Sequence, residues 1–325
     1  MDERIGIAVI GLGVIGRRML EQAARRDDLV VTGAWDIDPQ ARERAARDFP
    51  KATIAPDALS AIADPGTRIV YVGTPPAFHR EYSLLASAHG RKVFCEKPLA
   101  VDVAQGERLV REIESAGTPN AVNFVYASAP AARALAAAIA DGAIGKPLLI
   151  ETRLFFARWP RDWQASAKWL SFRAEGGFVR EVLSHFVYLM RDLFGDCSYR
   201  GSFVDYPADG KSCERAAVAM LDCAGVPVVV TAGAGGGGPD EVVFTVRGER
   251  GALRLDNWYG LQRAEGAGWV ETPVDHRPHP DMRTAAYQAQ LDALVQFGLG
   301  APQRLPTMAM ALEVQRLIER ILQPD

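Results

Sequence analysis

The sequence predicts an α/β protein in which an N-terminal doubly wound Rossmann domain precedes an α+β domain with a large, mostly antiparallel open sheet. Three observations predict this fold. Short apolar strand candidates alternate with helix candidates over residues 1–123, and the run GLGVIG joins the first strand to the first helix. In residues 124–325, strand candidates follow one another with no room for crossover helices.

The strands expected in the first domain are short and apolar, as in a parallel sheet covered on both faces. They span residues 5–10, 29–35, 68–73, 92–95 and 121–126. The expected helices span 14–26, 39–48, 57–63, 78–89 and 103–115. Right-handed crossovers then favour the doubly wound arrangement. We therefore expect a dinucleotide-binding domain over residues 1–123.

The second domain, residues 124–325, is expected to bind substrate and to mediate oligomerisation. Its strands are expected at 147–156, 198–206, 216–223, 227–232, 241–247 and 252–255. Its helices are expected at 131–140, 178–194, 283–297 and 308–322. The glycine run 233–238 precedes no helix, which favours a flexible hairpin loop over a phosphate-binding loop.

Composition excludes several classes of protein. The hydrophobic fraction is 48% and the charged fraction 24%, as in folded globular proteins, and a net charge of -3 argues against nucleic-acid binding. Acidic residues precede the first apolar run, and no run reaches the ~18 apolar residues of a membrane span. The four cysteines form no CxxC pair, so we expect reduced thiols and a cytoplasmic protein without a membrane partner.

The motif Gly11-Leu12-Gly13-Val14-Ile15-Gly16 follows a strand and opens a helix, which is the context of a dinucleotide-binding loop. Gly11 permits a tight turn, Gly13 lets the backbone approach a pyrophosphate, and Gly16 permits close packing of helix and strand. The amides at the helix start, including those of Val14 and Ile15, attract phosphate.

Asp36 lies 20 residues after Gly16, where an acid is expected to bind the ribose hydroxyls. A carboxylate there repels a 2′-phosphate by about 1–4 kcal/mol at 4 Å. We therefore predict NAD(H) as the cofactor in preference to NADP(H). The alternative is that Asp36 caps the next helix.

Two further segments complete a family pattern. Thr74-Pro75-Pro76-Ala77-Phe78-His79 follows the third strand, and Phe94-Cys95-Glu96-Lys97-Pro98-Leu99 ends the fourth. With the glycine loop and Gly176-Gly177 ahead of His185, they resemble the glucose–fructose oxidoreductase/inositol 2-dehydrogenase/rhizopine-catabolism (Gfo/Idh/MocA) family. The resemblance implies a Rossmann domain, an open-sheet domain, an active site between them, and a homodimer or homotetramer formed through the second sheet.

The resemblance implies that Lys97 faces the substrate oxygen and the nicotinamide ribose. A cation there would stabilise the alkoxide that develops during hydride transfer. Glu96 is expected in the cofactor shell, as is the backbone of Thr74, Pro75 and Pro76. The alternative for Lys97 is an ordinary surface lysine.

His185 keeps the histidine of the family pattern, while Glu181 stands four residues earlier, where the family usually has Asp. Residues four apart share a helix face, so the two side chains can cooperate. We expect His185 to be the general acid/base, because imidazoles titrate near neutrality. Glu181 would orient the imidazole or bind substrate hydroxyls. A structural role for His185 and a purely substrate-binding Glu181 stay open.

Other candidates are His79, behind the cofactor or simply packed in the core, and Asn123, at a strand end. Residues 153–180 interleave basic side chains with tryptophans, so Arg158 and Lys168 are expected to bind an acidic group of the substrate. A solvated basic loop is the alternative. Prolines and the lack of further ligands argue against a metal site at His276 and His279.

Together these observations predict an NAD-dependent oxidoreductase acting on a secondary alcohol or ketone of a sugar, a cyclitol or a related small molecule. Two alternatives remain. One is reduction of an imine or of a carboxylated ring, which the Glu181 substitution keeps open. The other is a non-catalytic dinucleotide-binding regulator, which would be expected to lose Lys97 or His185.

Overall fold

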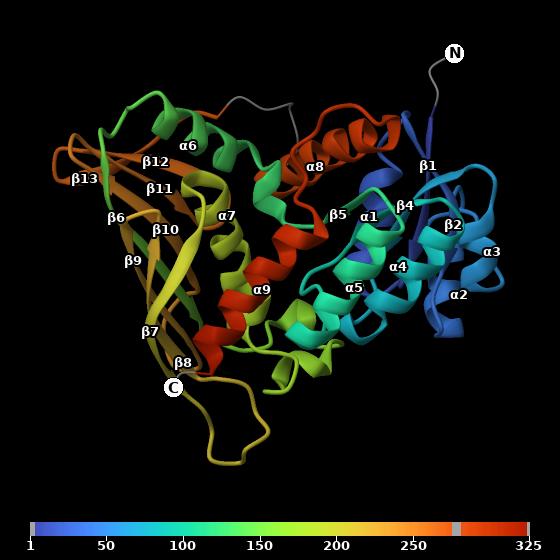
Figure 1. Ribbon diagram of the computed structural model, residues 1–325, viewed down its shortest axis with the longest axis horizontal. Coiled ribbons are helices and arrows are strands. Elements are labelled where there is room, and N and C mark those ends of the chain that lie inside the picture. The colour runs from blue at the N-terminus through green and yellow to red at the C-terminus, as the bar shows by residue number, and fades with distance from the viewer. Residues whose placement is uncertain (1–3, 275–280, 324–325) are drawn as a thin grey trace. The chain divides into compact units, whose positions relative to one another are not determined.

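The computed structural model describes residues 4–274 and 281–323 (Figure 1). The chain divides into two compact units. Unit 1 comprises Met1–Phe124 with Gln290–Leu312, and unit 2 comprises Val125–Ala289 with Glu313–Asp325. This division by contacts places 290–312 with unit 1, whereas the sequence-based division at residue 123 places the same segment in the second domain.

Segment 290–312 belongs to unit 1 because it bonds to the edge strand and to the core of that unit. The N–H of Val122 donates to the carbonyl of Pro306, and the N–H of Met308 donates to Asn120 Oδ1, both at 2.8 Å. A Cβ on Gly298 would lie 2.7 Å from the side chain of Ile5. These contacts join residues far apart in the chain, so no local pattern reveals them.

Unit 1 contains a parallel sheet with the strand order β2-β1-β3-β4-β5. Its strands are β1 Ile5–Ile10, β2 Leu29–Trp35, β3 Thr67–Val72, β4 Lys92–Cys95 and β5 Asn120–Val122. Its helices are α1 Val14–Ala23, α2 Pro39–Asp48, α3 Ala58–Ala63, η1 Pro76–Phe78, α4 His79–Ala88 and α5 Val103–Ser115. All six residues of β1 are buried, as expected for a strand covered on both faces. The doubly wound prediction is confirmed.

The strand order reverses beside β1, where the loops after β1 and β3 meet. The N–H of Gly73, just after β3, donates to the carbonyl of Ile10 at 2.8 Å. In open α/β sheets, ligands bind at the carboxyl ends of the strands, at such a switch point. The glycine loop and the Thr74 loop therefore flank the expected ligand position.

Unit 2 contains a mixed sheet with the order β13-β12-β11-β10-β6-β9-β8-β7. Its strands are β6 Pro147–Phe156, β7 Cys197–Asp205, β8 Ala216–Cys223, β9 Val226–Ala234, β10 Glu241–Gly248, β11 Ala252–Asp256, β12 Gly260–Glu265 and β13 Gly268–Glu271. Among these strands β6 and β9 are parallel, and the other neighbours are antiparallel. The prediction of a mostly antiparallel sheet is confirmed.

Unit 2 also contains helical elements, of which α6 and α7 pack on the sheet. They are η2 Val125–Ala127, α6 Pro130–Ala140, η3 Asp162–Gln164, η4 Lys168–Ser171, the π-helical turn η5 Val179–Leu183 and α7 Ser184–Phe194. Helix α6 packs against β11 and β12, and α7 against β7 and β8. The last two helices, α8 Met282–Leu299 and α9 Met308–Leu322, each contribute to both units.

Unit 2 differs from the expectation in two respects. Strands β12 and β13 were not expected, because they carry few apolar residues and Leu261 is the buried side chain of β12. The glycine run does not form a hairpin, since β9 and β10 lie on opposite sides of β6. The run instead passes the end of β6, where the N–H of Gly235 donates to the carbonyl of Phe156 at 2.9 Å.

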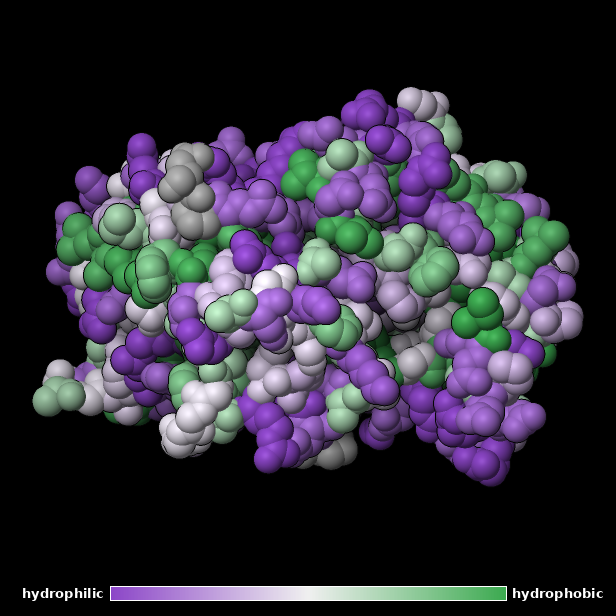
Figure 2. All heavy atoms as spheres, turned by 90° about the horizontal axis from the view of Figure 1, so that it is seen from below, coloured by the Kyte–Doolittle hydropathy of each residue, from purple (hydrophilic) through white to green (hydrophobic). Residues whose placement is uncertain are grey.

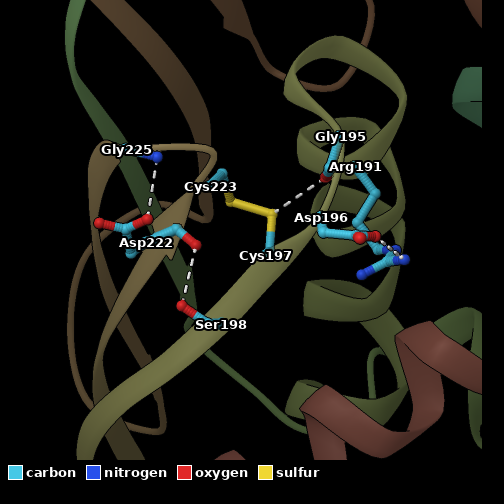
Figure 3. The surroundings of a disulfide bond; sticks show 8 residues. All are labelled: Arg191, Gly195, Asp196, Cys197, Ser198, Asp222, Cys223 and Gly225. Atoms are coloured by element: carbon cyan, nitrogen blue, oxygen red, sulfur yellow. Dashed lines mark hydrogen bonds and ion pairs between the residues drawn. A yellow bond between two sulfur atoms is a disulfide. The ribbon is translucent and has the colours of Figure 1, made fainter.

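The expectation that all four thiols are reduced is also wrong. Cys197 and Cys223 form a disulfide between paired positions of β7 and β8 (Figure 3). Their Cα atoms are 4.0 Å apart, although the two residues are 26 positions apart in sequence. Strand register, which no cysteine motif reveals, brings them together. Cys95 and Cys213 are buried free thiols.

Candidate active site

The segment between β1 and α1 has the geometry that a dinucleotide loop requires. Gly11 has a φ of +93°, and a Cβ there would lie 2.7 Å from the carbonyl carbon of Gly73. A Cβ on Gly16 would lie 1.8 Å from the carbonyl oxygen of Gly11. Apart from Gly13 and its two chain neighbours, no described atom lies within 4 Å of a Cβ built on Gly13, which leaves space beside the start of α1. These residues fit a phosphate at the helix start.

Asp36 follows β2 directly and is bonded to this loop. Its Oδ2 accepts the N–H of Leu12 at 2.6 Å, and its Oδ1 accepts the N–H of Asp38 at 2.9 Å. The N-cap of α2 is Asp38, whose side chain accepts from the N–H of Gln40. Asp36 therefore does not cap the helix, and the alternative role considered for it is excluded. Its half-buried carboxylate lies at the carboxyl end of β2, beside the glycine loop.

His79 ties the loop after β3 to the loop after β4. Its ring is buried, with Nε2 2.8 Å from the carbonyl oxygen of Thr74 and Nδ1 3.2 Å from that of Leu99. Burial lowers the pKa of His79 below its usual value, which favours the neutral ring. A neutral ring has one N–H and donates to only one of these carbonyls, Thr74 or Leu99. His79 thus has an internal role, and a contact between His79 and the cofactor stays a prediction. Thr74 Oγ1 is buried and has no hydrogen-bond partner among the described residues, as expected of a group that could contact a bound cofactor.

A buried polar network supports the Glu96–Lys97 segment. Glu96 Oε1 accepts from Tyr71 Oη at 2.5 Å and from Asn123 Nδ2 at 2.6 Å. Asn123 Oδ1 in turn accepts from Gln290 Nε2 at 3.1 Å. Both ends of the Asn123 side chain are therefore bonded inside unit 1, and substrate binding by Asn123 stays a prediction. Tyr71 and Gln290 were not predicted from the sequence, although the position of Tyr71 in an apolar strand could have indicated a buried hydroxyl.

Lys97 directly follows Glu96 at the carboxyl end of β4. It is half-buried, and its backbone N–H donates to Glu96 Oε2 at 3.3 Å. The peptide bond between Lys97 and Pro98 is cis. Glu96, which is itself held by Tyr71 and Asn123, thus fixes the backbone that carries the Lys97 side chain.

His185 lies in an aromatic cluster of unit 2. Its ring is 9% exposed and meets the rings of Tyr126 and Trp258 edge-on, at centroid distances of 6.3 and 6.2 Å. Trp258 has a φ of +73° and also packs on Phe186. Burial raises the pKa of Tyr126 well above its usual value, so its hydroxyl stays neutral. The His185 ring therefore packs against two aromatic rings of unit 2, those of Tyr126 and Trp258.

Arg161 lies among four aromatic rings. Its guanidinium carbon is 4.7 Å from the ring centroid of Trp163 and between 5.3 and 5.6 Å from those of Phe156, Trp159 and Trp258. Cation–π attraction favours such an arrangement. Arg161 is the basic residue of segment 153–180 that reaches the cluster around His185, and the sequence analysis did not select it.

Gln164 connects Arg161 to Glu181. The buried Gln164 side chain accepts from Arg161 Nε at 2.9 Å and donates to Glu181 Oε1 at 3.1 Å. Glu181 itself is half-buried in the π turn that opens the His185 helix, and its N–H donates to the carbonyl of Gly177. The buried glutamine was missed, although it lies in the tryptophan-rich segment that the sequence singled out.

The other basic residues of this segment lie elsewhere. Arg158 is exposed and pairs with Asp162, and Lys168 is exposed at the start of η4. Arg180, the last basic residue of the segment, is buried and pairs through two bonds with Glu319 of α9. Arg180 therefore has a structural role, while substrate binding by Arg158 and Lys168 stays a prediction.

A buried carboxyl supports the start of the His185 helix. Glu214 Oε1 accepts the N–H of Val179 at 2.8 Å, and a Cβ on Gly177 would lie 2.2 Å from Glu214 Oε2. Gly177 also has a φ of +97°, so the second glycine of the Gly-Gly pair is required on both counts. Desolvation raises the pKa of Glu214 to about 7.

Residues 4–274 and 281–323 hold no group of three or more side chains able to bind a metal ion. His276 and His279 lie outside the described residues. Within the described part of the chain, no helix is both long and apolar enough to cross a bilayer.

Named relatives match less than half of the chain. An inositol 2-dehydrogenase from Acidothermus cellulolyticus is 38% identical over 154 residues, which are 46% of this chain and 44% of that protein. A 1,5-anhydro-D-fructose reductase from Ensifer adhaerens is 35% identical over 138 residues, or 42% of this chain and 40% of that protein. The aligned part of the chain thus spans less than half the length of these relatives.

The fold extends further than the sequence match. The crystal structure of an oxidoreductase from Agrobacterium radiobacter, in complex with NAD+, L-tartaric acid and magnesium, superposes with a TM-score of 0.81. That match covers 97% of this chain and 94% of the other at 20% identity, so it shows a shared fold.

Two family profiles assign the chain. Residues 5–124 match the profile described as "Oxidoreductase family, NAD-binding Rossmann fold", and residues 132–254 match the "GFO/IDH/MocA C-terminal domain". The two matches name one family and follow each other in the expected order. The chain belongs to the Gfo/Idh/MocA family of oxidoreductases.

Proposed function

We propose that the protein is an NAD(H)-dependent oxidoreductase that acts on a secondary alcohol or ketone of a sugar, a cyclitol or a related polyhydroxylated molecule. The observation that carries the proposal is the bond from the N–H of Leu12 to Asp36, which holds a carboxylate beside the glycine loop. Relatives named as inositol 2-dehydrogenase and 1,5-anhydro-D-fructose reductase support the substrate class.

The residues of unit 1 fit this cofactor. The open space at Gly13 and the helix amides suit its pyrophosphate, Asp36 suits the ribose hydroxyls, and the unpartnered Thr74 hydroxyl is available beyond them. When bound, the nicotinamide exchanges a hydride with carbon. The chain's own task is to stabilise the oxygen on that carbon and to move its proton.

Lys97 and His185 are proposed to share this task. The ammonium group of Lys97 stabilises negative charge on the substrate oxygen, and His185 takes or returns the hydroxyl proton. Glu181, which is held by Gln164, contacts substrate hydroxyls or orients the imidazole. The proposal requires both nitrogens, Lys97 Nζ and one nitrogen of His185, to reach one small molecule.

A second copy of this chain is the proposed protein partner. The face of the unit 2 sheet opposite the helices carries exposed apolar side chains on neighbouring strands, including Val218 and Met220 of β8. Figure 2 shows one face of the molecule, where hydrophobic residues are interspersed among hydrophilic ones. Apolar residues that are scattered singly on a surface need no partner. A contiguous row of exposed apolar side chains on a sheet indicates an interaction surface.

Stopped-flow absorbance of NADH tests the proposed activity. The protein would be mixed with NAD and a panel of cyclitols, sugars and sugar acids, and in the reverse direction with NADH and the corresponding ketones. We expect NADH formation with at least one polyhydroxylated alcohol and loss of that signal in Lys97→Met. Tight NADH binding without turnover across the panel would instead support a non-catalytic regulator.

A further inference from the structure

The amide of Gln164 has an orientation that its neighbours determine. Arg161 Nε can only donate a hydrogen bond and an ionised carboxylate can only accept one, so the amide oxygen must face Arg161 and the amide nitrogen must face Glu181. The side chain is 3% exposed, so water does not readily replace either bond. Gln164 is therefore a rigid spacer between a guanidinium and a carboxylate.

Arg161, at the other end of this spacer, also touches the ring that packs on His185. Its guanidinium carbon lies 5.6 Å from the centroid of Trp258, and the Trp258 and His185 centroids are 6.2 Å apart. One side chain thus connects to Glu181 through Gln164 and to His185 through Trp258. All of these residues belong to unit 2.

We infer that Arg161 and Gln164 are positioning residues that fix the Glu181 carboxylate relative to the His185 imidazole; this inference rests on the proposed function. Glu181 has one more methylene than the Asp of the usual pattern, and hence one more torsion to restrain. Glu181 also lies in the π turn at the start of the His185 helix, where side-chain directions differ from those of an α-helix. The bond from Gln164 restrains the Glu181 carboxylate. The shorter side chain of an Asp would need less restraint.

Gln164→Met tests the bond while keeping the length and packing of the side chain. We expect kcat on the substrate found in the panel to fall by about 10- to 100-fold, because misplacement by about 1 Å has effects of this size. The affinity for NADH should not change, since the glycine loop belongs to unit 1.

Gln164→Glu separates positioning from simple packing. The new carboxylate can still accept from Arg161, but it faces Glu181 with like charge at a distance that was a hydrogen bond. We expect a larger loss of kcat at neutral pH than in Gln164→Met, and a recovery toward acid pH, where one proton shared by the pair restores a donor. A merely structural glutamine would produce no such acid recovery.

The chain offers a matched control in Gln262. Gln262 accepts from Arg254 Nε at 2.6 Å and donates to Glu271 Oε1 at 2.5 Å, and Arg254 lies 4.4 Å from the ring centroid of Trp269. Gln262→Met therefore breaks the same kind of triad on β11–β13. We expect its kcat, KM and pH profile to match those of the wild type.

Crystal structures of the wild type and of Gln164→Met give a readout independent of activity. A displaced Glu181 side chain in the variant supports the inference even if no substrate is turned over, in which case the proposed function alone fails. Unchanged kinetics together with an unmoved Glu181 overturn it. If Gln164→Met does not fold, Arg161→Lys, which keeps the charge but removes Nε, replaces it with the same expected and overturning results.

Discussion

The carboxylate of Asp36 accepts the backbone N–H of Leu12 at 2.6 Å, so the end of β2 is bonded to the glycine loop that follows β1. A second bond, from the N–H of Asp38, holds the other carboxylate oxygen. The carboxylate is therefore fixed beside the loop by bonds to both of its oxygens. A fixed charge discriminates more sharply between neutral and anionic ligands than a mobile one does.

Asp36→Ser is expected to weaken the preference for NADH over NADPH. Loss of the repulsion between the Asp36 carboxylate and the 2′-phosphate should change the ratio of the two dissociation constants by roughly 5- to 1000-fold. Fluorescence titration of both cofactors measures the ratio. Asp38→Asn is the control, because Asp38 is exposed and caps α2, and the ratio should not change there. An unchanged ratio in Asp36→Ser would refute the assignment.

His185→Ala is expected to reduce kcat about 100-fold or more, because general acid–base catalysis contributes about 10²- to 10⁴-fold. The affinity for NADH should stay unchanged. His89→Ala is the matched control, since His89 is exposed at the end of α4 and is bonded to the carbonyl of Leu85. A loss below tenfold with intact substrate binding would remove His185 from the acid–base role.

Features that depend on residues close together in the sequence were predicted better than features that depend on distant residues. The glycine loop, Asp36 and the Glu96–Lys97 segment lie within short motifs, and their positions at strand ends follow from alternating strands and helices. The strand expected over 121–126 ends at Val122 instead, because the chain turns there and Asn123 bonds to Glu96. A polar residue at the end of an apolar run could have marked that turn.

The features that sequence could not predict depend on distant pairs. Gln290 reaches Asn123 across 167 positions, and Cys197 meets Cys223 only through the register of two strands. Arg158 and Arg161 have the same chemistry and lie three residues apart, yet only the folded loop shows that Arg161 packs among aromatic rings while Arg158 is exposed. Residue type and spacing alone did not separate them.

Stability should depend on pH through Glu214. The folded pKa of about 7 exceeds the ordinary value of 4.5, so between these pH values the folded chain keeps a proton that the unfolded chain releases. The unfolding free energy should therefore fall as pH rises from 4.5 to 7, by up to about 3 kcal/mol from this group. Glu214→Gln stays neutral and should lose this contribution.

Urea denaturation at pH 5 and pH 8, followed by a signal from unit 2, measures how Glu214→Gln changes the unfolding free energy. The unfolding free energy of the wild type should fall more from pH 5 to pH 8 than that of the variant does. Glu249→Gln, at an exposed position of the same unit, is the control. Parallel pH dependences in wild type and Glu214→Gln would contradict the prediction.

The disulfide predicts a thiol count and a stability change. Denaturation without reductant should expose two titratable thiols, Cys95 and Cys213, whereas reduction should raise the number to four. Because the bridge closes a loop of 26 residues, Cys197→Ser/Cys223→Ser should lower the unfolding free energy by about 3–4 kcal/mol on the chain-entropy account. Four thiols without reductant would show that the cysteines are reduced, as expected for a cytoplasmic location.

The open face of the unit 2 sheet should mediate self-association. Phe203 pairs with Val218 across β7 and β8, and Met220 pairs with Val229 across β8 and β9. These four side chains are between 39% and 66% exposed and form one contiguous apolar area, which a second copy could cover in a self-complementary interface.

Sedimentation velocity at micromolar concentrations should show a dimer or tetramer for the wild type and a smaller species for Met220→Glu. Met310→Glu, at a comparably exposed methionine of α9, should leave the assembly intact, because Met310 is not on the sheet. Since a charge buried in an apolar interface costs several kcal/mol, even one substitution should suffice, and a monomeric wild type would contradict the interface altogether.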